Sequence, residues 1–193
     1  MKYYKLLIIA QIAALVAATS GSCKKTGDVQ ISGGLKQWHT VTLTFEGPES
    51  GEYDTLNPFT DYRLDAEFTN GTSSFVVPGY FAADGNAAET SANSGNKWRV
   101  KFCPPAPGEW TYKVSFVKGR NIAVSDNTGS AIKLYPDGVT GTLEISGTDN
   151  NSPGFLSKGR LKYDGTRYLK LEGTGEIFLK GGADSPENFL AYR

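Results

Sequence analysis

Two cysteines and one histidine are the residues of this chain best suited by type to supply a thiolate nucleophile, a general base or a soft metal ligand. Cys103 lies in Phe102-Cys103-Pro104-Pro105, whereas His39 lies in a distant strand-like run, so no base is paired with the thiol. His39 shares the phase of the apolar residues that follow it, which favours a histidine inside the core or at its rim. We expect Cys103 to be a half-buried structural residue, and one histidine without a cysteine pair does not support a zinc site.

Two other motifs have part of the spacing of ligand-binding loops. Gly173-Thr174-Gly175-Glu176 begins like a nucleotide loop, but a third glycine is missing and a strand-like run follows it. Asp149-Asn150-Asn151-Ser152 offers oxygen atoms to a cation without the full ligand spacing of a calcium loop. We interpret the second motif as a solvated turn and the first as no nucleotide loop, and the sequence indicates neither a metal site nor a cofactor.

The N-terminus has the three parts of an export signal. Lys2 and Lys5 precede the apolar run from Leu6 to Ala18, which is too short to span a bilayer comfortably, and the small residues Thr19-Ser20-Gly21-Ser22 follow it. Cys23 comes directly after these small residues. This arrangement resembles a bacterial lipoprotein signal, in which the cysteine is acylated and becomes the mature N-terminus.

The number of cysteines bears on this prediction. If Cys23 carries a lipid, Cys103 has no partner and the exported domain has no disulfide framework. A bridge between Cys23 and Cys103 is the alternative, and ordinary secretion stays open because Ser20-Gly21-Ser22 also fits a small-x-small cleavage rule. The sequence predicts a protein that is lipid-anchored in the bacterial cell envelope, at the periplasmic or surface face of the outer membrane, with secretion as the alternative.

Charge and length limit the classes of partner and the number of domains. Twenty basic and 20 acidic residues balance, so no field of one sign attracts nucleic acid, and membrane contact is expected through the lipid alone. After the leader, about 170 residues remain, which suits one domain of ordinary size.

Short runs of alternating apolar residues, separated by turn clusters, follow a polar segment over residues 24–35. Glu46-Gly47-Pro48 is expected to end the first run, and the run that begins at Phe75 is apolar on both faces, as in a covered strand or an edge against another domain. The runs are Val41–Phe45, Asp61–Phe68, Phe75–Phe81, Trp98–Phe102 and Trp110–Phe116, with weaker ones at Ile132–Tyr135 and Leu143–Ser146. This pattern predicts an all-β, immunoglobulin-like two-sheet sandwich.

A β-hairpin is expected after the sandwich. Arg160–Tyr163 and Tyr168–Leu171 flank Asp164-Gly165, a favoured hairpin turn. We divide the chain into a signal peptide (1–22), a lipid-anchored tether (23–35), the sandwich (36–147), and a linker with the hairpin and the start of a further domain (148–193).

Several separated motifs resemble one known family. They are Trp38 to Pro48, Asn57-Pro58-Phe59-Thr60-Asp61-Tyr62-Arg63-Leu64, Pro78-Gly79-Tyr80-Phe81-Ala82-Ala83-Asp84-Gly85, Trp98-Arg99-Val100-Lys101-Phe102 and Pro107-Gly108-Glu109-Trp110. In this order they are similar to the DUF5060 domain, an Ig-like sandwich at the N-terminus of bacterial glycoside-hydrolase-like proteins. The resemblance implies a downstream catalytic barrel as partner.

The last residues look like the opening of such a (β/α)8 barrel, of the DUF4038 or DUF5605 kind. The resemblance makes Ile177 to Lys180 its first strand and gives Asp184 and Glu187 a sugar-binding or loop-shaping role in the complete protein. The alternative is that Asp184-Ser185-Pro186-Glu187 starts a helix. Glycoside hydrolysis needs two carboxyl groups across the scissile bond, and in barrels these lie on several strands that this chain lacks.

The sequence therefore predicts a noncatalytic accessory module that packs against and positions a glycoside-hydrolase barrel. The alternative is an independent carbohydrate-binding module, because aromatic rings can stack on sugars. Trp98 and Trp110 lie in the core phase, whereas Trp38 and Tyr53 are expected to be free for stacking. A complete hydrolase would need a catalytic acidic pair within the sandwich, and none stands out.

Overall fold

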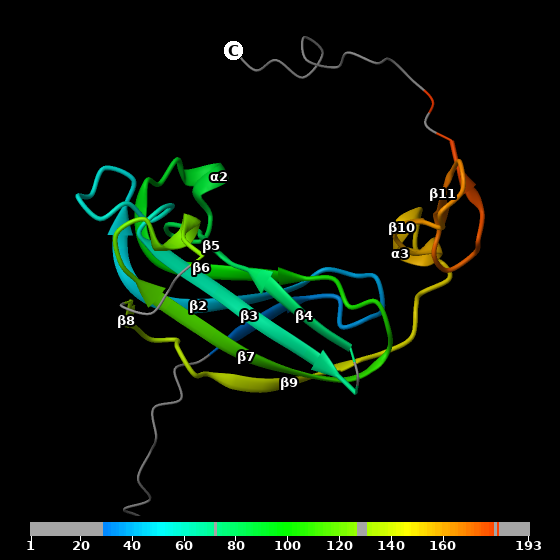
Figure 1. The fold of residues 1–193 in the computed structure, drawn as a ribbon, viewed down its shortest axis with the longest axis horizontal. Coiled ribbons are helices and arrows are strands. Elements are labelled where there is room, and N and C mark those ends of the chain that lie inside the picture. Colours follow the sequence, from blue (N-terminus) through cyan, green and yellow to red (C-terminus); the bar gives the residue numbers. More distant parts are fainter. Residues whose placement is uncertain (1–28, 72, 127–130, 180, 182–193) are drawn as a thin grey trace, which may run out of the picture.

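The computed structural model describes residues 29–71, 73–126, 131–179 and 181. The predicted signal peptide, Cys23, Asp184 and Glu187 lie outside these residues. Most of the described chain forms two β-sheets, and a small third sheet follows them (Figure 1).

The first sheet has the strand order β1-β2-β6-β5. Its strands are β1 (Gln30–Gly33), β2 (Val41–Gly51), β6 (Ser94–Phe102) and β5 (Tyr80–Phe81). The second sheet has the order β4-β3-β7-β8, and β9 also pairs with β7. Its strands are β4 (Ser73–Pro78), β3 (Tyr62–Asn70), β7 (Gly108–Lys118), β8 (Ile132–Lys133) and β9 (Thr140–Ile145). The strands of both sheets pair antiparallel.

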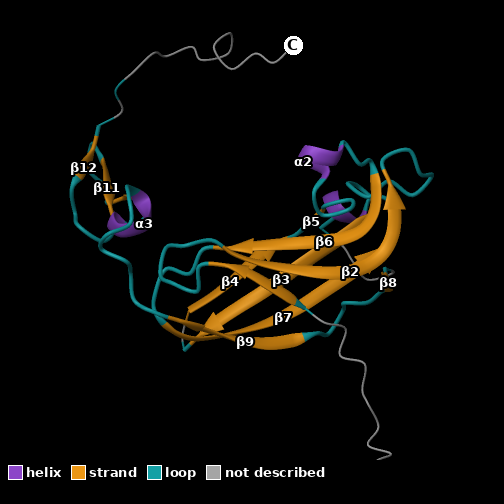
Figure 2. Cartoon of the chain, turned by 180° about the vertical axis from the view of Figure 1, so that it is seen from behind, coloured by secondary structure: helices purple, strands orange, loops and turns teal. Residues whose placement is uncertain are grey.

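The two sheets pack face to face over an aromatic core (Figure 2). Phe68 of one sheet stacks on Phe102 of the other with ring centroids 4.0 Å apart. Trp98 and Phe116 meet across the same interface at 4.8 Å. Alternate residues of β3, of most of β7, and of Val41–Phe45 in β2 and Trp98–Phe102 in β6 are buried between the sheets, so the predicted all-β two-sheet sandwich is confirmed.

Strand β2 is longer than the sequence predicted. Glu46-Gly47-Pro48 does not end it; a register shift between Glu46 and Ser50 lets pairing with β6 resume. The irregular stretch wraps Trp98, whose Nε1 donates a hydrogen bond to the Pro48 carbonyl at 3.1 Å. A side chain at Gly47 would overlap the Trp98 ring. The glycine and proline therefore shape a bulge around a core residue.

The run from Phe75 to Phe81 is divided between the sheets. β4 lies at an edge, where Phe75 packs on the core and Val76 is exposed, and β5 pairs with β6 in the other sheet. β4 is therefore an edge strand, but Val76 leaves its outer face open, so within the described residues this edge is not pressed against another domain, as that alternative required. Pro78 and Gly79 carry the chain from one sheet to the other, and Gly79 lies so close to Leu64 that a side chain there would overlap it.

The first strand begins inside the segment assigned to the tether. Gln30–Gly33 pair with Val41–Thr44 as the edge strand β1. The polar character of this strand hid it from the sequence analysis, because all four of its residues are exposed at the sheet edge. The short elements α2 (Ala87–Thr90) and η1 (Ile122–Val124) lie at the other end of the sandwich, away from the third sheet (Figure 1).

The third sheet forms a small C-terminal unit with the helix α3 (Phe155–Lys158). The predicted hairpin is present as β10 (Leu161–Tyr163) and β11 (Leu169–Leu171), with Gly165 at a φ of 83° in the turn. β12 (Ile177–Phe178) pairs antiparallel with β11. The role of Ile177 to Lys180 as a first barrel strand stays a prediction, since the chain beyond is described only at residue 181.

Candidate functional site at the junction

The aromatic residues singled out from the sequence have three different environments. Trp98 and Trp110 are buried in the core, as predicted. Tyr53 is 87% exposed in the loop after β2. Trp38 is half-buried, and it lies where the sandwich meets the C-terminal unit.

The benzo ring of Trp38 is wedged against two glycines of the C-terminal unit. A Cβ built on Gly159 would lie 3.0 and 3.1 Å from Cε2 and Cζ2 of the indole. A Cβ on Gly173 would overlap Cη2 of the same ring. The ring is therefore in a packing position between two units of the fold, where the sequence analysis expected a free sugar platform.

The backbone of Trp38 is fixed on the sandwich side. Its φ is 64°, in the left-handed region that non-glycine residues seldom adopt, and its N–H donates to the Pro104 carbonyl at 2.9 Å. Within the described part of the chain, the indole Nε1 is buried without a hydrogen-bond partner. A strained backbone and an unpaired indole N–H both cost free energy, so the packing of this ring must offset them.

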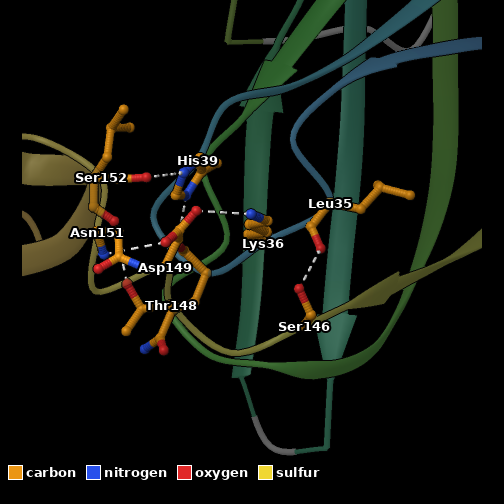
Figure 3. A network of polar contacts seen from close by, with 10 residues as sticks. Leu35, Lys36, His39, Ser146, Thr148, Asp149, Asn151 and Ser152 are labelled. Atoms are coloured by element: carbon orange, nitrogen blue, oxygen red, sulfur yellow. Dashed lines mark hydrogen bonds and ion pairs between the residues drawn. The ribbon is translucent and has the colours of Figure 1, made fainter.

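A polar network joins Lys36 and His39, which flank Trp38 in the sequence, to residues 149–152 (Figure 3). Lys36 Nζ lies 2.9 Å from Asp149 Oδ2, and the Asp149 Oδ1 atom accepts the Asn151 N–H at 3.1 Å. His39 Nε2 lies 3.4 Å from the Ser152 hydroxyl, while its Nδ1 lies 3.0 Å from the Gln37 carbonyl. The histidine is half-buried at the rim of the sandwich, in accordance with the sequence analysis.

The charges of this network reinforce its geometry. The Lys36 ammonium, followed by the Asn151 N–H, lowers the pKa of the Asp149 carboxyl from its usual value. The carboxylate therefore stays ionised at neutral pH and bonded to a residue 113 positions earlier in the chain. The interpretation of residues 149–152 as a turn holds, and the turn is bound to the sandwich.

The loop between β1 and β2, which contains Lys36, Trp38 and His39, is itself hydrogen-bonded to segments that follow β6 and β9. Gln37 donates from its side chain to the Pro105 carbonyl at 2.8 Å and from its backbone N–H to the Ser146 carbonyl at 2.9 Å. The Leu35 carbonyl accepts both the hydroxyl of Ser146, at 3.1 Å, and its N–H, at 3.0 Å (Figure 3). The loop thus binds the end of β9, where the chain leaves the sandwich.

The Ser152 hydroxyl lies 3.4 Å from His39 Nε2, and the other ring nitrogen of His39 faces the Gln37 carbonyl instead of an orienting carboxylate. Cys103 is exposed, in contrast to the half-buried position expected for it, although nearby atoms desolvate its thiol and raise its pKa. Among the described residues, no three His, Cys, Asp or Glu side chains are grouped so as to hold a metal ion. Across all the residues that the structure describes, the helices do not have the length and apolar character needed to span a bilayer.

Sequence reasoning missed Lys36, Gly159 and Gly173. Lys36 was assigned to the start of the sandwich without a partner, and contacts over more than a hundred residues leave no local pattern. Gly173 was weighed as part of a nucleotide loop. The available signal was Gly159 and Gly173 themselves. Glycines without a clear role in a turn can indicate that another segment of the chain approaches closely.

The family comparison agrees with the sequence resemblance. Residues 34–117 match the model of the family described as a domain of unknown function, DUF5060. This segment contains β2 to β7 together with the Trp38 loop.

One similar solved structure is described as a "putative glycoside hydrolase" from Bacteroides vulgatus, with 23% sequence identity and a TM-score of 0.47. The match covers 74% of this chain and 20% of that protein. The comparison with curated proteins gave no match.

Proposed function

We propose that this chain is a noncatalytic N-terminal accessory module of a cell-envelope lipoprotein involved in glycan degradation. Its sandwich would pack against and position a glycoside-hydrolase barrel that follows the C-terminal unit. The proposal is supported by the DUF5060 match at residues 34–117 and by the resemblance of the last residues to a barrel opening.

The observation that carries the proposal is the Trp38 junction. A flexible linker would let the following domain move freely, whereas this segment is bound by a ring wedged between Gly159 and Gly173 and by the Lys36–Asp149 ion pair. Such a connection fixes the C-terminal unit relative to the sandwich, and therefore also fixes the direction in which the chain leaves β12. A module whose only role is to bind a ligand does not require such a fixed connection.

The C-terminal unit also presents an incompletely covered apolar face. The register places Tyr163, Leu169 and Phe178 in one cross-strand row. Phe155 of α3 contacts Phe178 with ring centroids 6.0 Å apart, but Tyr163 remains 64% exposed and Leu169 41% exposed. A barrel that begins directly after β12 is the partner we propose for this face, because the chain delivers it to that position.

The reading frame beyond Arg193 tests this proposal. We expect it to encode alternating strands and helices, and we expect the protein from the whole frame to hydrolyse a glycoside. In that protein, Trp38→Ala should make the sandwich and the barrel unfold in separate thermal transitions, while Tyr53→Ala should leave the transitions unchanged. Two results would contradict the accessory role. One is a frame that ends at Arg193 in intact relatives, and the other is a Trp38→Ala variant whose thermal transitions are the same as those of the wild type.

The lipid anchor is a separate part of the proposal. An acyl chain on Cys23 would hold the protein at the membrane. Cys23→Ala should then move the protein from the membrane fraction to the soluble fraction, as judged by fractionation and by loss of labelling with a fatty-acid analogue. Unchanged membrane retention of this variant would rule out the anchor.

Carbohydrate binding by the sandwich itself is the second candidate function. The exposed ring of Phe59 favours it, because it lies on a cleft away from the junction.

A further inference from the structure

A cleft of about 380 Å³ is lined in part by residues of β5 and η1. These two elements lie at the end of the sandwich opposite the C-terminal unit (Figure 1). Its lining includes Phe59, Tyr80 and Val124, which are exposed, and the polar side chains of Arg63 and Asp65. The volume lies in the range of small-ligand sites, which combine apolar walls with a few polar groups.

The two loops that border the cleft are fixed to each other by Asp61. Its carboxylate accepts the N–H of Asn57 at 2.9 Å and that of Asn121 at 2.7 Å. The Thr60 carbonyl also accepts the Ala123 N–H at 2.9 Å. These bonds join the loop before β3 to η1, so the walls are preorganised and little ordering is needed when a ligand binds.

The aromatic rim of the cleft is anchored in the core. Phe59 meets Phe81 edge to face with ring centroids 6.2 Å apart, and Phe81 in turn packs on Trp98 at 5.1 Å. Phe59 nevertheless remains 55% exposed. Tyr80 is 40% exposed, and the Lys101 ammonium lies over its ring, 5.9 Å from the centroid. A rigid, exposed ring next to polar groups is suited to a ligand with both C–H faces and hydroxyl groups.

The polar part of the cleft is a hydrogen-bonded pair. Arg63 Nε donates to Asp65 Oδ2 at 2.7 Å, and Arg63 Nη1 donates to the Ser125 carbonyl at 3.1 Å. The guanidinium has five N–H donors and the carboxylate has several lone pairs, so the pair can still donate to and accept from adjacent hydroxyls. With Asp126, the cleft carries one positive and two negative side chains, which disfavours an anionic ligand.

The rim continues into a second hollow of about 340 Å³, which Phe59, Tyr80 and Phe81 also line. Its charged lining residues, Glu52 and Arg99, have opposite signs. The aromatic residues therefore form a ridge between two adjoining hollows. An extended ligand that crosses the ridge would use both hollows, whereas a single small molecule would fill one.

We propose that this cleft binds a neutral oligosaccharide, with one sugar ring stacked on Phe59 and its hydroxyls bonded to the Arg63–Asp65 pair. The proposal deepens the second candidate function and does not depend on the junction or on a downstream barrel.

Native affinity electrophoresis of the full chain tests the proposal. The gels would contain hydroxyethylcellulose, xylan, galactomannan, arabinogalactan or, as the anionic comparison, polygalacturonate. At least one neutral polysaccharide should retard the protein, and polygalacturonate should not. Phe59→Ala should weaken retention about tenfold, from lost ring contact. Arg63→Gln should weaken it about fivefold to tenfold, from lost hydrogen bonds.

Tyr53→Ala tests the other stacking position expected from the sequence, because Tyr53 is more exposed than Phe59 and lines neither hollow. Its retention should equal that of the wild type, and circular dichroism should show all three variants folded. Lack of retention on every neutral polysaccharide, or equal retention of the Phe59 and Tyr53 variants, would overturn the proposal. Neither result would affect the accessory role, which the reading frame and the Trp38 variant test separately.

Discussion

Trp98 illustrates how one buried side chain can join both sheets of the sandwich. Its ring contacts Tyr62, Phe81 and Phe116, and its indole N–H is satisfied by the Pro48 carbonyl. Trp98→Ala would leave a large cavity and remove these contacts, so we expect a loss of about 3 to 5 kcal/mol in the free energy of unfolding. Urea denaturation measures this change.

Tyr53→Ala is the reference for that experiment. The ring is 87% exposed, so its removal should change the free energy of unfolding by no more than about 0.5 kcal/mol. A loss below about 1 kcal/mol for Trp98→Ala would contradict its place in the core.

Asp61 gives the sandwich a dependence on pH. Hydrogen bonds from the Asn121 and Asn57 N–H groups lower the pKa of its carboxyl from the ordinary value of 3.8. A carboxyl with a lowered folded-state pKa stabilises the fold above its unfolded pKa, and this stability is lost as the pH falls below that value. Asp61→Asn should therefore lower the melting temperature at pH 7.

The same substitution should also weaken the fall in melting temperature below about pH 4. Asp149 and Asp164 have lowered pKa values too, so the acid slope should become shallower without disappearing. Melting curves of wild type and variant, recorded side by side from about pH 2.5 to neutral pH so that they span the unfolded pKa of an aspartate, measure the effect. Identical slopes would show that Asp61 does not titrate in the way its hydrogen bonds imply.

At the scale of elements, the junction depends on two glycines whose missing side chains make room for Trp38. Gly173 approaches both the Trp38 ring and the Lys158 carbonyl, so a methyl group there would force them apart. We expect Gly173→Ala to lower the free energy of local opening of the C-terminal unit by about 1 to 3 kcal/mol. Amide hydrogen exchange at β10 and β11 measures this.

Gly147→Ala is the matched control for Gly173→Ala. Gly147 lies in the linker, where an added Cβ would have no neighbouring atom within 4 Å, and its backbone is not in the left-handed region. Its substitution should leave exchange in β10 and β11 unchanged. Equal effects of the two substitutions would mean that the wedge does not fix the unit.

The elements differ in how far the sequence predicted them. Alternation in Trp98–Phe102 and Trp110–Phe116 identified β6 and β7 because each has one buried and one outward face. β1 was missed, since an exposed edge strand has no such contrast. The Trp38 wedge was also missed, because its partners lie far along the chain and are glycines. The Phe59 cleft was not predicted for a similar reason. It forms where η1 is hydrogen-bonded to the loop before β3, and these two segments lie far apart in the sequence.

At the scale of the whole molecule, stability is concentrated in the sandwich. Its core contains nearly all of the buried apolar residues, whereas Leu171 is the buried hydrophobic residue within the described part of the C-terminal unit. Hydrogen exchange should therefore be slow around Val41 and Val100 and faster in the C-terminal unit, with the fastest exchange between about Gly173 and Phe178. Strong protection through β12 would contradict this order.

The last prediction concerns catalysis by the chain as it stands. Hydrolysis by the usual route needs one carboxyl group to protonate the leaving oxygen and a second to act as nucleophile or base. In the described residues, the carboxylates of Asp61, Asp84, Asp149 and Asp164 accept hydrogen bonds from N–H groups, hydroxyls or lysines that lower the pKa of each, which is the opposite of what a general acid needs. The purified chain should therefore release no product from a panel of aryl glycosides and polysaccharides. Activity that survives purification and disappears when an acidic pair within the sandwich is replaced by amides would show that the chain is itself a hydrolase.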